Sequence, residues 1–183
     1  MIEFTDINKN LPNGLNMGGV QQAIYFGYHA DVATFPAKPV NPTTLEANAT
    51  LTGNLVMKTG KRMFRLYITD DTGEFNVESV GEVDGKSFVL HLSFFHPGMQ
   101  KTILGFINAA KNDNLVFVVT DSDGQQYLMG DEMRPAVYQG APDGGGTGKE
   151  TAARKGMSCE FTYKTGNVHV YTGTVPLTEA ASA

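Results

Sequence analysis

The sequence contains one cysteine, Cys159, among 183 residues. A single cysteine excludes a disulfide within the chain and a zinc site built mainly from cysteines. Basic residues are also few: 14 Lys and Arg stand against 19 Asp and Glu, which leaves a formal net charge of −5 at pH 7. Tight binding of nucleic-acid phosphates needs clustered Lys and Arg, so this balance argues against it. A surface that DNA merely passes remains compatible with such a charge.

Long apolar runs are absent as well, since no stretch approaches the roughly 20 residues of a membrane-spanning helix. The first ten residues, MIEFTDINKN, carry neither a basic segment nor an apolar one, so we expect no signal peptide and no membrane anchor. We expect synthesis in the cytoplasm of the cell that makes the protein. The length fits a single domain, residues 1–183, and 41% hydrophobic residues can supply a sizeable core.

The densest apolar region, residues 85–120, predicts a strand, a helix and a second strand. Apolar residues first recur at every second position, the spacing of one strand face: Phe88, Leu90, Leu92 and Phe94. The spacing then changes to that of an amphipathic helix, about residues 98–111, with its apolar stripe centred on Ile103, Phe106 and Ile107. Residues 115–119 are apolar throughout and predict a strand buried on both faces.

The rest of the chain predicts mainly strands and turns, so the expected fold class is mainly β, a β-sandwich or barrel with one flanking helix and long loops. Strands are expected over residues 23–29, 49–58 and 61–70. Residues 61–70 are partly apolar on both faces, which predicts a central strand or one that meets a partner chain. Residues 121–124, DSDG, predict a hairpin turn. Residues 156–166 and VHVYTG after them predict an antiparallel strand pair.

Three segments lack a strand pattern. Residues 1–19 predict an arm whose order depends on what it touches. Residues 31–48, with prolines at every third position from Pro36 to Pro42, predict an extended linker that runs over a surface. Residues 141–156 are rich in glycine and predict a mobile loop.

One predicted strand, within residues 74–84, has an acidic face. Glu74, Glu78, Glu82 and Asp84 share one parity, while Phe75, Val77 and Val83 share the other. The simpler interpretation is a solvated strand face. The functional interpretation is a surface kept negative so that DNA slides by without sticking, because phosphates are repelled without any specific contact.

The sequence lacks residues that the known motifs of catalysis, cofactor binding and metal binding require. The stretch GGGTGKET resembles a phosphate-binding loop, but Asp143 and Glu150 stand where that motif requires glycine and a hydroxyl. The four histidines show no metal-ligand spacing. Cys159 lies on the apolar parity of its strand, which predicts an inert core thiol. We therefore expect no enzyme, no cofactor and no metal.

Strands are followed along the chain by GKSFVLHLSFFHPGMQKTILGFINAAKNDNLVFVV, a DG hairpin, a Gly-rich loop and the final GMSCEFTYKTGNVHVYTG. This order of segments resembles that of the phage major tail tube proteins over about residues 23–174. The resemblance implies a virion protein that self-assembles into stacked hexameric rings around a DNA channel. It implies a lumen lined by strands of all subunits, with Glu74, Glu78, Glu82 and Asp84 as candidate lumen-facing residues. Its partners would be copies of itself, a tail terminator, and baseplate or tail-tip proteins. The arm 1–19, the proline-rich stretch 35–42 and the loop 141–156 are the candidates for contacts with the next ring.

Other functions stay open. A capsid decoration protein, a head-to-tail joining subunit or a secretion-system tube protein belongs to the same broad class. A small β-rich ligand-binding protein, with Tyr25, Tyr28 and Tyr67 lining a pocket, belongs to a different one.

Overall fold

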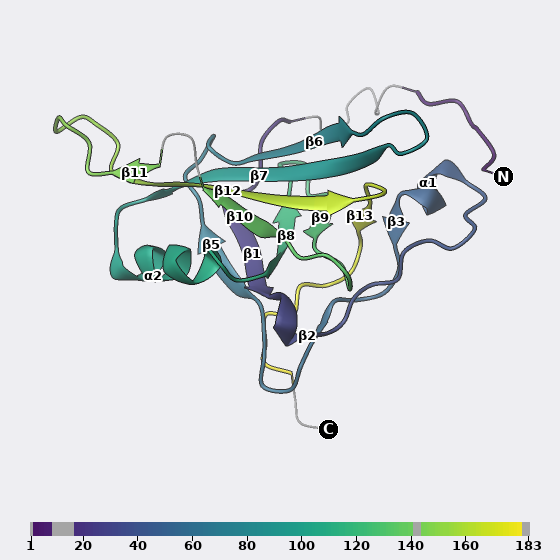
Figure 1. Cartoon of the computed structure of the whole chain (residues 1–183), viewed down its shortest axis with the longest axis horizontal. Helices are drawn as coiled ribbons and strands as arrows, with labels where there is room; N and C mark the ends of the chain where they lie inside the picture. The colour runs from purple at the N-terminus through teal and green to yellow at the C-terminus, as the bar shows by residue number, and fades with distance from the viewer. Residues whose placement is uncertain (1, 9–16, 141–143, 181–183) are drawn as a thin grey trace.

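The computed structural model describes residues 2–8, 17–140 and 144–180. It is mainly β, as the sequence predicts, with two larger sheets, a small β ribbon and one long helix (Figure 1). The six-stranded sheet has the order β3-β13-β9-β8-β1-β5. Its strands are β1 (Ala23–Tyr28), β3 (Thr50–Leu51), β5 (Phe64–Tyr67), β8 (Leu115–Thr120), β9 (Gln126–Met129) and β13 (Val170–Tyr171).

The five-stranded sheet has the order β10-β12-β7-β6, with β11 also paired to β12. Its strands are β6 (Glu74–Val80), β7 (Ser87–Pro97), β10 (Val137–Gly140), β11 (Gly145–Gly146) and β12 (Gly156–Thr165). The remaining elements are β2 (Val32–Thr34), which pairs with β4 (Val56–Met57), the 3₁₀ turn η1 (His29–Asp31), and the helices α1 (Leu45–Asn48) and α2 (Lys101–Ala110).

The two larger sheets pack on each other across one hydrophobic core, as the layers of a β-sandwich do. The five-stranded sheet contributes the apolar parities of β7 and β12, and the six-stranded sheet contributes residues from β1, β5, β8 and β9. Phe161 lies at the centre of this core, fully buried, with its ring centroid 4.6 Å from that of Phe117 in the opposite sheet. The alternation predicted for residues 88–94 is confirmed: Leu90, Leu92 and Phe94 are buried.

Strand β8 is buried along its whole length, as predicted for residues 115–119. Leu115, Phe117 and Val119 face the core between the sheets. Val116 and Val118 face a second cluster on the other side, which β2, β4 and the segments around them cover. The six-stranded sheet is therefore covered on both faces, and this explains why β8 is apolar at every position.

Helix α2 packs beside the core through the predicted stripe. Ile103 and Ala110 are buried, and Phe106 approaches Phe26 of β1 to 4.7 Å between ring centroids. The helix begins later than residue 98 because Gly98 has a φ of +83° and Gln100 is an extended N-cap. The strand, helix and strand of residues 85–120 are confirmed, but β7 and β8 lie in different sheets, so α2 links the two layers.

Strand β5 is not central. It is an edge strand of the six-stranded sheet, and Phe64 and Tyr67 are 43% and 45% exposed. Apolar residues on both faces of a strand indicate burial only where a layer covers each face. Tyr67 lies on the face opposite buried Leu66 and is not covered by the described residues, while Phe64, on the same face as Leu66, lies at the margin of the core against Phe26. The alternative expectation, contact with a partner chain, stays open.

The segment 49–58 does not form one strand. It forms β3 and β4, separated by a turn in which Gly53 has a φ of +95°. Helix α1 before it lies within the stretch predicted to be extended; Thr44 caps it by accepting a hydrogen bond from the Ala47 amide at 3.2 Å. This N-cap threonine, followed by Glu46 in the first turn, is a helix signal that the proline pattern outweighed.

The prediction that β13 pairs with the preceding strand is wrong. β12 pairs with β7 and β10, whereas β13 joins the other sheet between β3 and β9. The physical reason lies in Tyr171, which is buried in the second apolar cluster. Its hydroxyl accepts from the Leu55 amide at 2.9 Å and donates to the Thr174 carbonyl at 2.8 Å. The predicted hairpin at residues 121–124 is confirmed between β8 and β9.

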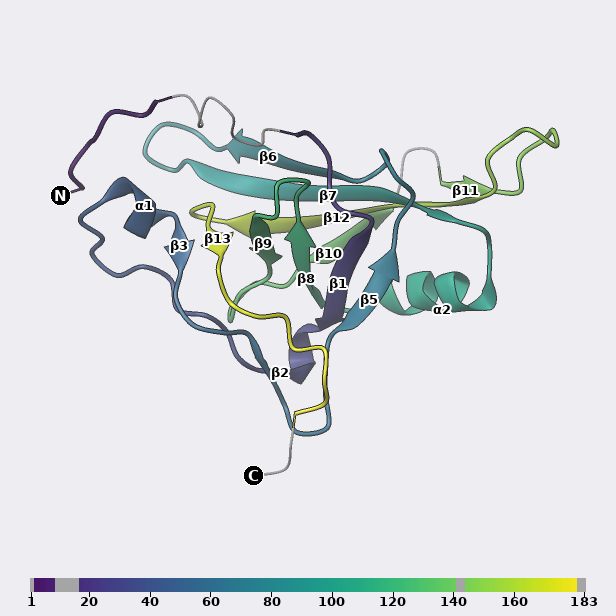
Figure 2. The ribbon, with the colours of Figure 1, turned by 180° about the vertical axis from the view of Figure 1, so that it is seen from behind.

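The glycine-rich segment, where it is described, forms a narrow projection. Figure 2 shows β11 and the loop after it extending beyond α2, away from the body of the sandwich. β11 pairs with the start of β12, and Arg154 lies over the ring of Phe95 at 4.3 Å. Residues 141–143 of the predicted loop and residues 9–16 of the predicted arm lie outside the described residues.

Candidate functional site

The outer face of the five-stranded sheet is polar and carries more acidic than basic side chains: Glu74, Glu78 and Glu160 against Lys164 of β12. The strands β6, β7 and β12 pair so that Glu74, Ser93 and Glu160 lie side by side across it. Their neighbours toward the core, Phe75, Leu92 and Phe161, occupy the opposite parity of the same strands. Alternation along paired strands therefore collects on one face the polar residues of the consecutive strands β6 and β7 and of β12, which is distant in sequence. We call this surface the acidic face and define it by Glu74, Glu78, His91, Ser93 and Glu160.

His91 lies between two carboxylates on this face. Its Nε2 is 3.1 Å from Oε2 of Glu78, and its Nδ1 is 3.1 Å from Oε1 of Glu160. An imidazolium can donate to both carboxylates, whereas a neutral ring can donate to only one. The His91 ring therefore links β6 to β12 across β7 through these two contacts.

The acidic face is hollowed rather than flat. An open depression of about 640 Å³ lies over it, lined by Glu74, Glu78, His91, Ser93 and Glu160 among others. The Glu78 side chain is 60% exposed, so water screens its charge, while that of Glu160 is 26% exposed. Such a surface repels polyanions over about one Debye length, roughly 8 Å at physiological salt.

Only part of the predicted acidic set belongs to this face. Glu74 and Glu78 lie on β6 as predicted, but β6 ends at Val80. Glu82 and Asp84 lie in the turn to β7, where Gly81 has a φ of +103° and Asp84 one of +67°. The period of two ends at this reversal, because only an extended strand keeps alternate side chains on one face.

The opposite face of β6 is buried only in part. Phe75 is half-buried and stacks on Tyr127 at 4.6 Å between ring centroids, while Val77 is 42% exposed. β6 is the edge strand of its sheet, so the core beneath it thins out.

Glu160 is the residue that the sequence pattern did not connect to the acidic set. Its even parity within β12 places it on the polar face, but nothing local shows which strand lies beside β12. The pairing of β12 with β7, and of β7 with β6, supplies that information. The alternation of residues in β12 indicates which of its side chains share the polar face, but it does not indicate which strands lie beside β12.

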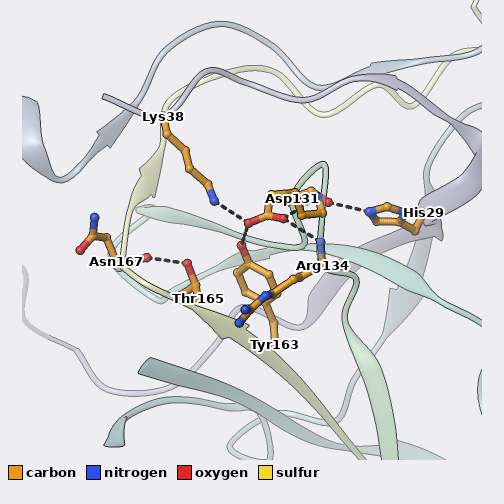
Figure 3. Close-up of polar contacts among 8 residues, drawn as sticks. His29, Lys38, Asp131, Arg134, Tyr163, Thr165 and Asn167 are labelled. Atoms are coloured by element: carbon orange, nitrogen blue, oxygen red, sulfur yellow. Dashed lines mark hydrogen bonds and ion pairs between the residues drawn. The ribbon is translucent and has the colours of Figure 1, made fainter. Parts of the chain in front are cut away.

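A second polar cluster lies around Asp131, at the end of β9. Figure 3 shows Lys38, Tyr163 and the backbone of Arg134 converging on its carboxylate, while His29 reaches its carbonyl. Burial raises the pKa of the Asp131 carboxyl, but these hydrogen bonds outweigh it and lower the pKa to about 2. The cluster ties the proline-rich segment to β12, which is a structural role.

The cysteine and the tyrosines singled out in the sequence occupy separate surroundings. Burial raises the pKa of the Cys159 thiol to about 12, so the thiol stays protonated and unreactive at neutral pH. Tyr25 packs against the second apolar cluster, whereas Tyr28 and Tyr67 line two different hollows near α2. The structure does not bring the three tyrosines into one pocket.

Within residues 2–8, 17–140 and 144–180, no group of three or more His, Cys, Asp or Glu side chains is arranged to hold a metal ion. None of the described helices is both long and apolar enough to cross a membrane. Comparison with protein-family models, with curated proteins and with solved structures finds no match to this chain.

Proposed function

We propose that the chain is a structural subunit that assembles with copies of itself into a phage tail tube, with the acidic face toward a channel that DNA passes through. The observation that carries the proposal is the acidic face itself. It joins Glu74, Glu78 and Glu160 on the outer side of a sheet whose inner side is core. A wall of that kind repels phosphates without binding them.

The edges of the same sheet support assembly. β6 and β10 are its outer strands, so each presents backbone groups to the outside. If β6 of one copy pairs with β10 of the next, repetition of that contact closes a ring and leaves no free edge in the wall. The acidic face would then line the ring continuously. We propose hexameric rings from the resemblance to tail tube proteins.

Projecting segments give such rings a means of stacking. The hairpin that contains β11 extends from one end of the molecule, and residues 2–8 lie beside α1 at the other (Figure 1). In this proposal both segments lie near ring faces, and the virion tail is where the protein acts. A terminator and tip proteins would complete the tube.

Negative-stain electron microscopy of the purified chain tests assembly. Rings or tubes are the expected result, because both edges of the five-stranded sheet are open to pairing. A chain that stays monomeric at high protein concentration by sedimentation velocity contradicts the proposal.

A charge reversal tests the role of the acidic face. Tubes of the Glu74→Lys/Glu78→Lys variant should retain duplex DNA that wild-type tubes release, and the retention should weaken as salt rises. The matched control is Glu46→Lys/Asp113→Lys, which makes the same charge change at two exposed residues outside the face. If the two variants retain DNA equally, the acidic face does not line a DNA channel, even if tubes form.

A further inference from the structure

An apolar groove lies between α2 and the edge of the six-stranded sheet. Two neighbouring hollows of about 210 and 70 Å³ form it, and the packed rings of Phe26 and Phe106 line both. Phe64 lines the smaller hollow and Tyr67 the larger. We call this surface the α2 groove.

Three aromatic side chains at the α2 groove are more exposed to solvent than is favourable for large apolar groups. Phe64, Tyr67 and Tyr28 are between 43% and 45% exposed, although each lines one of the hollows. Contiguous apolar surface of this kind on a β-rich protein marks a site of contact with another molecule. Aromatic residues at the rim can pack edge-to-face on an aromatic side chain from outside and can cover an aliphatic one.

An apolar segment without cover lies on the same chain. In residues 2–8, Phe4 and Ile7 are 87% and 88% exposed. Backbone contact with the segment before α1 holds this arm, through the Glu3 amide and the Thr43 carbonyl at 2.8 Å. In Figure 1 the arm, beside α1, lies toward one end of the longest axis of the molecule and α2 toward the other, so the arm held in this way does not reach the groove beside α2 of its own copy.

The charges of the arm and the groove are complementary. The arm carries Glu3 and Asp6 on either side of Phe4. Arg65 lines the larger hollow, and the Arg62 guanidinium lies over the Phe64 ring at 4.5 Å. Among the described residues, no carboxylate lines either hollow. An acidic segment with two apolar side chains therefore matches the groove both in charge and in apolar character.

We propose that the α2 groove receives residues 2–8 of a second copy of this chain, with Phe4 and Ile7 in the two hollows and the arm carboxylates beside Arg65 and Arg62. The contact is head-to-tail, because the donor surface and the acceptor surface differ and face opposite ends. Repetition of such a contact adds copies in series. The inference rests on the proposed self-assembly and names the surfaces that hold successive copies together.

The test compares full-length variants by sedimentation velocity over a range of protein concentrations. Phe4→Ser/Ile7→Ser should weaken self-association about tenfold or more, as the loss of apolar anchors at an interface does. Both side chains are exposed in the single chain, so its folding should not change. The control is Val40→Ser/Met133→Ser, which removes two apolar side chains that are 85% and 90% exposed elsewhere, and it should associate as the wild type does.

A charge exchange tests the pairing itself. Arg65→Glu alone and Glu3→Arg/Asp6→Arg alone should each weaken association, and the variant that combines all three changes should recover much of it. Recovery requires that these charges face each other across the interface, which a general effect of net charge does not produce.

The outcomes separate this inference from the proposed function. A wild-type chain that never associates refutes both. If Phe4→Ser/Ile7→Ser associates as the wild type does, only the docking of the arm is refuted. The pairing of sheet edges would then account for the contact between copies. Combined charge variants that associate no better than the single ones also refute arm docking.

Discussion

Replacing Asp131 by asparagine tests whether one carboxylate holds the proline-rich segment on the sandwich. Asp131 accepts hydrogen bonds from the Lys38 ammonium at 2.5 Å and the Tyr163 hydroxyl at 2.7 Å. Its other oxygen accepts from the amides of Met133 at 2.9 Å and Arg134 at 2.8 Å. The side chain is only 14% exposed, so these bonds form where water competes weakly.

The magnitude follows from the pKa of the carboxyl. Burial raises this pKa, and the hydrogen bonds from Lys38, Tyr163 and the two amides outweigh burial and lower the pKa from 3.8 to about 2. Such a difference between the unfolded and folded chain corresponds to about 2 kcal/mol of stability. The folded pKa is the lower one, so this contribution is complete above about pH 4 and is lost as the pH falls toward 2.

The assay is urea unfolding of the wild type and Asp131→Asn between pH 7 and the lowest pH at which both fold. We expect the variant to be less stable by about 2 kcal/mol at pH 7, because asparagine is neutral beside Lys38. The difference should shrink below pH 4. Asp113→Asn, at an exposed aspartate, is the control and should match the wild type at every pH.

A stability difference that stays constant from pH 7 to pH 3 would refute the argument. It would show that asparagine fits the site poorly and that the charge of Asp131 contributes nothing. Equal stability of wild type and variant at pH 7 would refute it as well.

Three further changes probe the core, the second cluster and the projecting hairpin. Phe161→Ala removes a fully buried ring between the sheets and should lower the unfolding free energy by about 3–5 kcal/mol in urea titration. Tyr171→Phe leaves the buried Leu55 amide without its acceptor and should lower it by about 1–3 kcal/mol. In Gly156→Ala, the new Cβ would lie 2.3 Å from the His96 carbonyl oxygen, so the strand pairing should loosen and trypsin should cleave the hairpin faster. Wild-type values in any of these measurements would contradict the packing that motivates it.

Local periodicity was sufficient for the elements that carry most of the core. The alternation in β7, the helical stripe of α2 and the apolar run of β8 each reflect how neighbouring side chains orient along a single segment. Those orientations depend on backbone geometry alone. For the same reason, the polar parity of β12 and the acidic parity of β6 could be assigned before any contact was known.

Segments whose structure depends on distant partners were predicted less well. β5 has apolar residues on both faces but lies at a sheet edge, and β13 joins the six-stranded sheet instead of pairing with β12 before it. α1 was missed because nearby prolines favoured an extended chain over the capping signal of Thr44. For β5 and β13, residues far away in sequence decided between alternatives that were locally similar, whereas for α1 two local signals conflicted.

The sequence by itself determined that the chain is mainly β, which parities of its strands are polar, and that Glu74 and Glu78 share one of them. The tertiary structure decided what these residues face. Strand pairing sets Glu160 and His91 beside them and removes Glu82 and Asp84 to a turn. Charge on a strand is a local property, whereas a charged surface is made by strands that meet, and only the fold brings β6, β7 and β12 together.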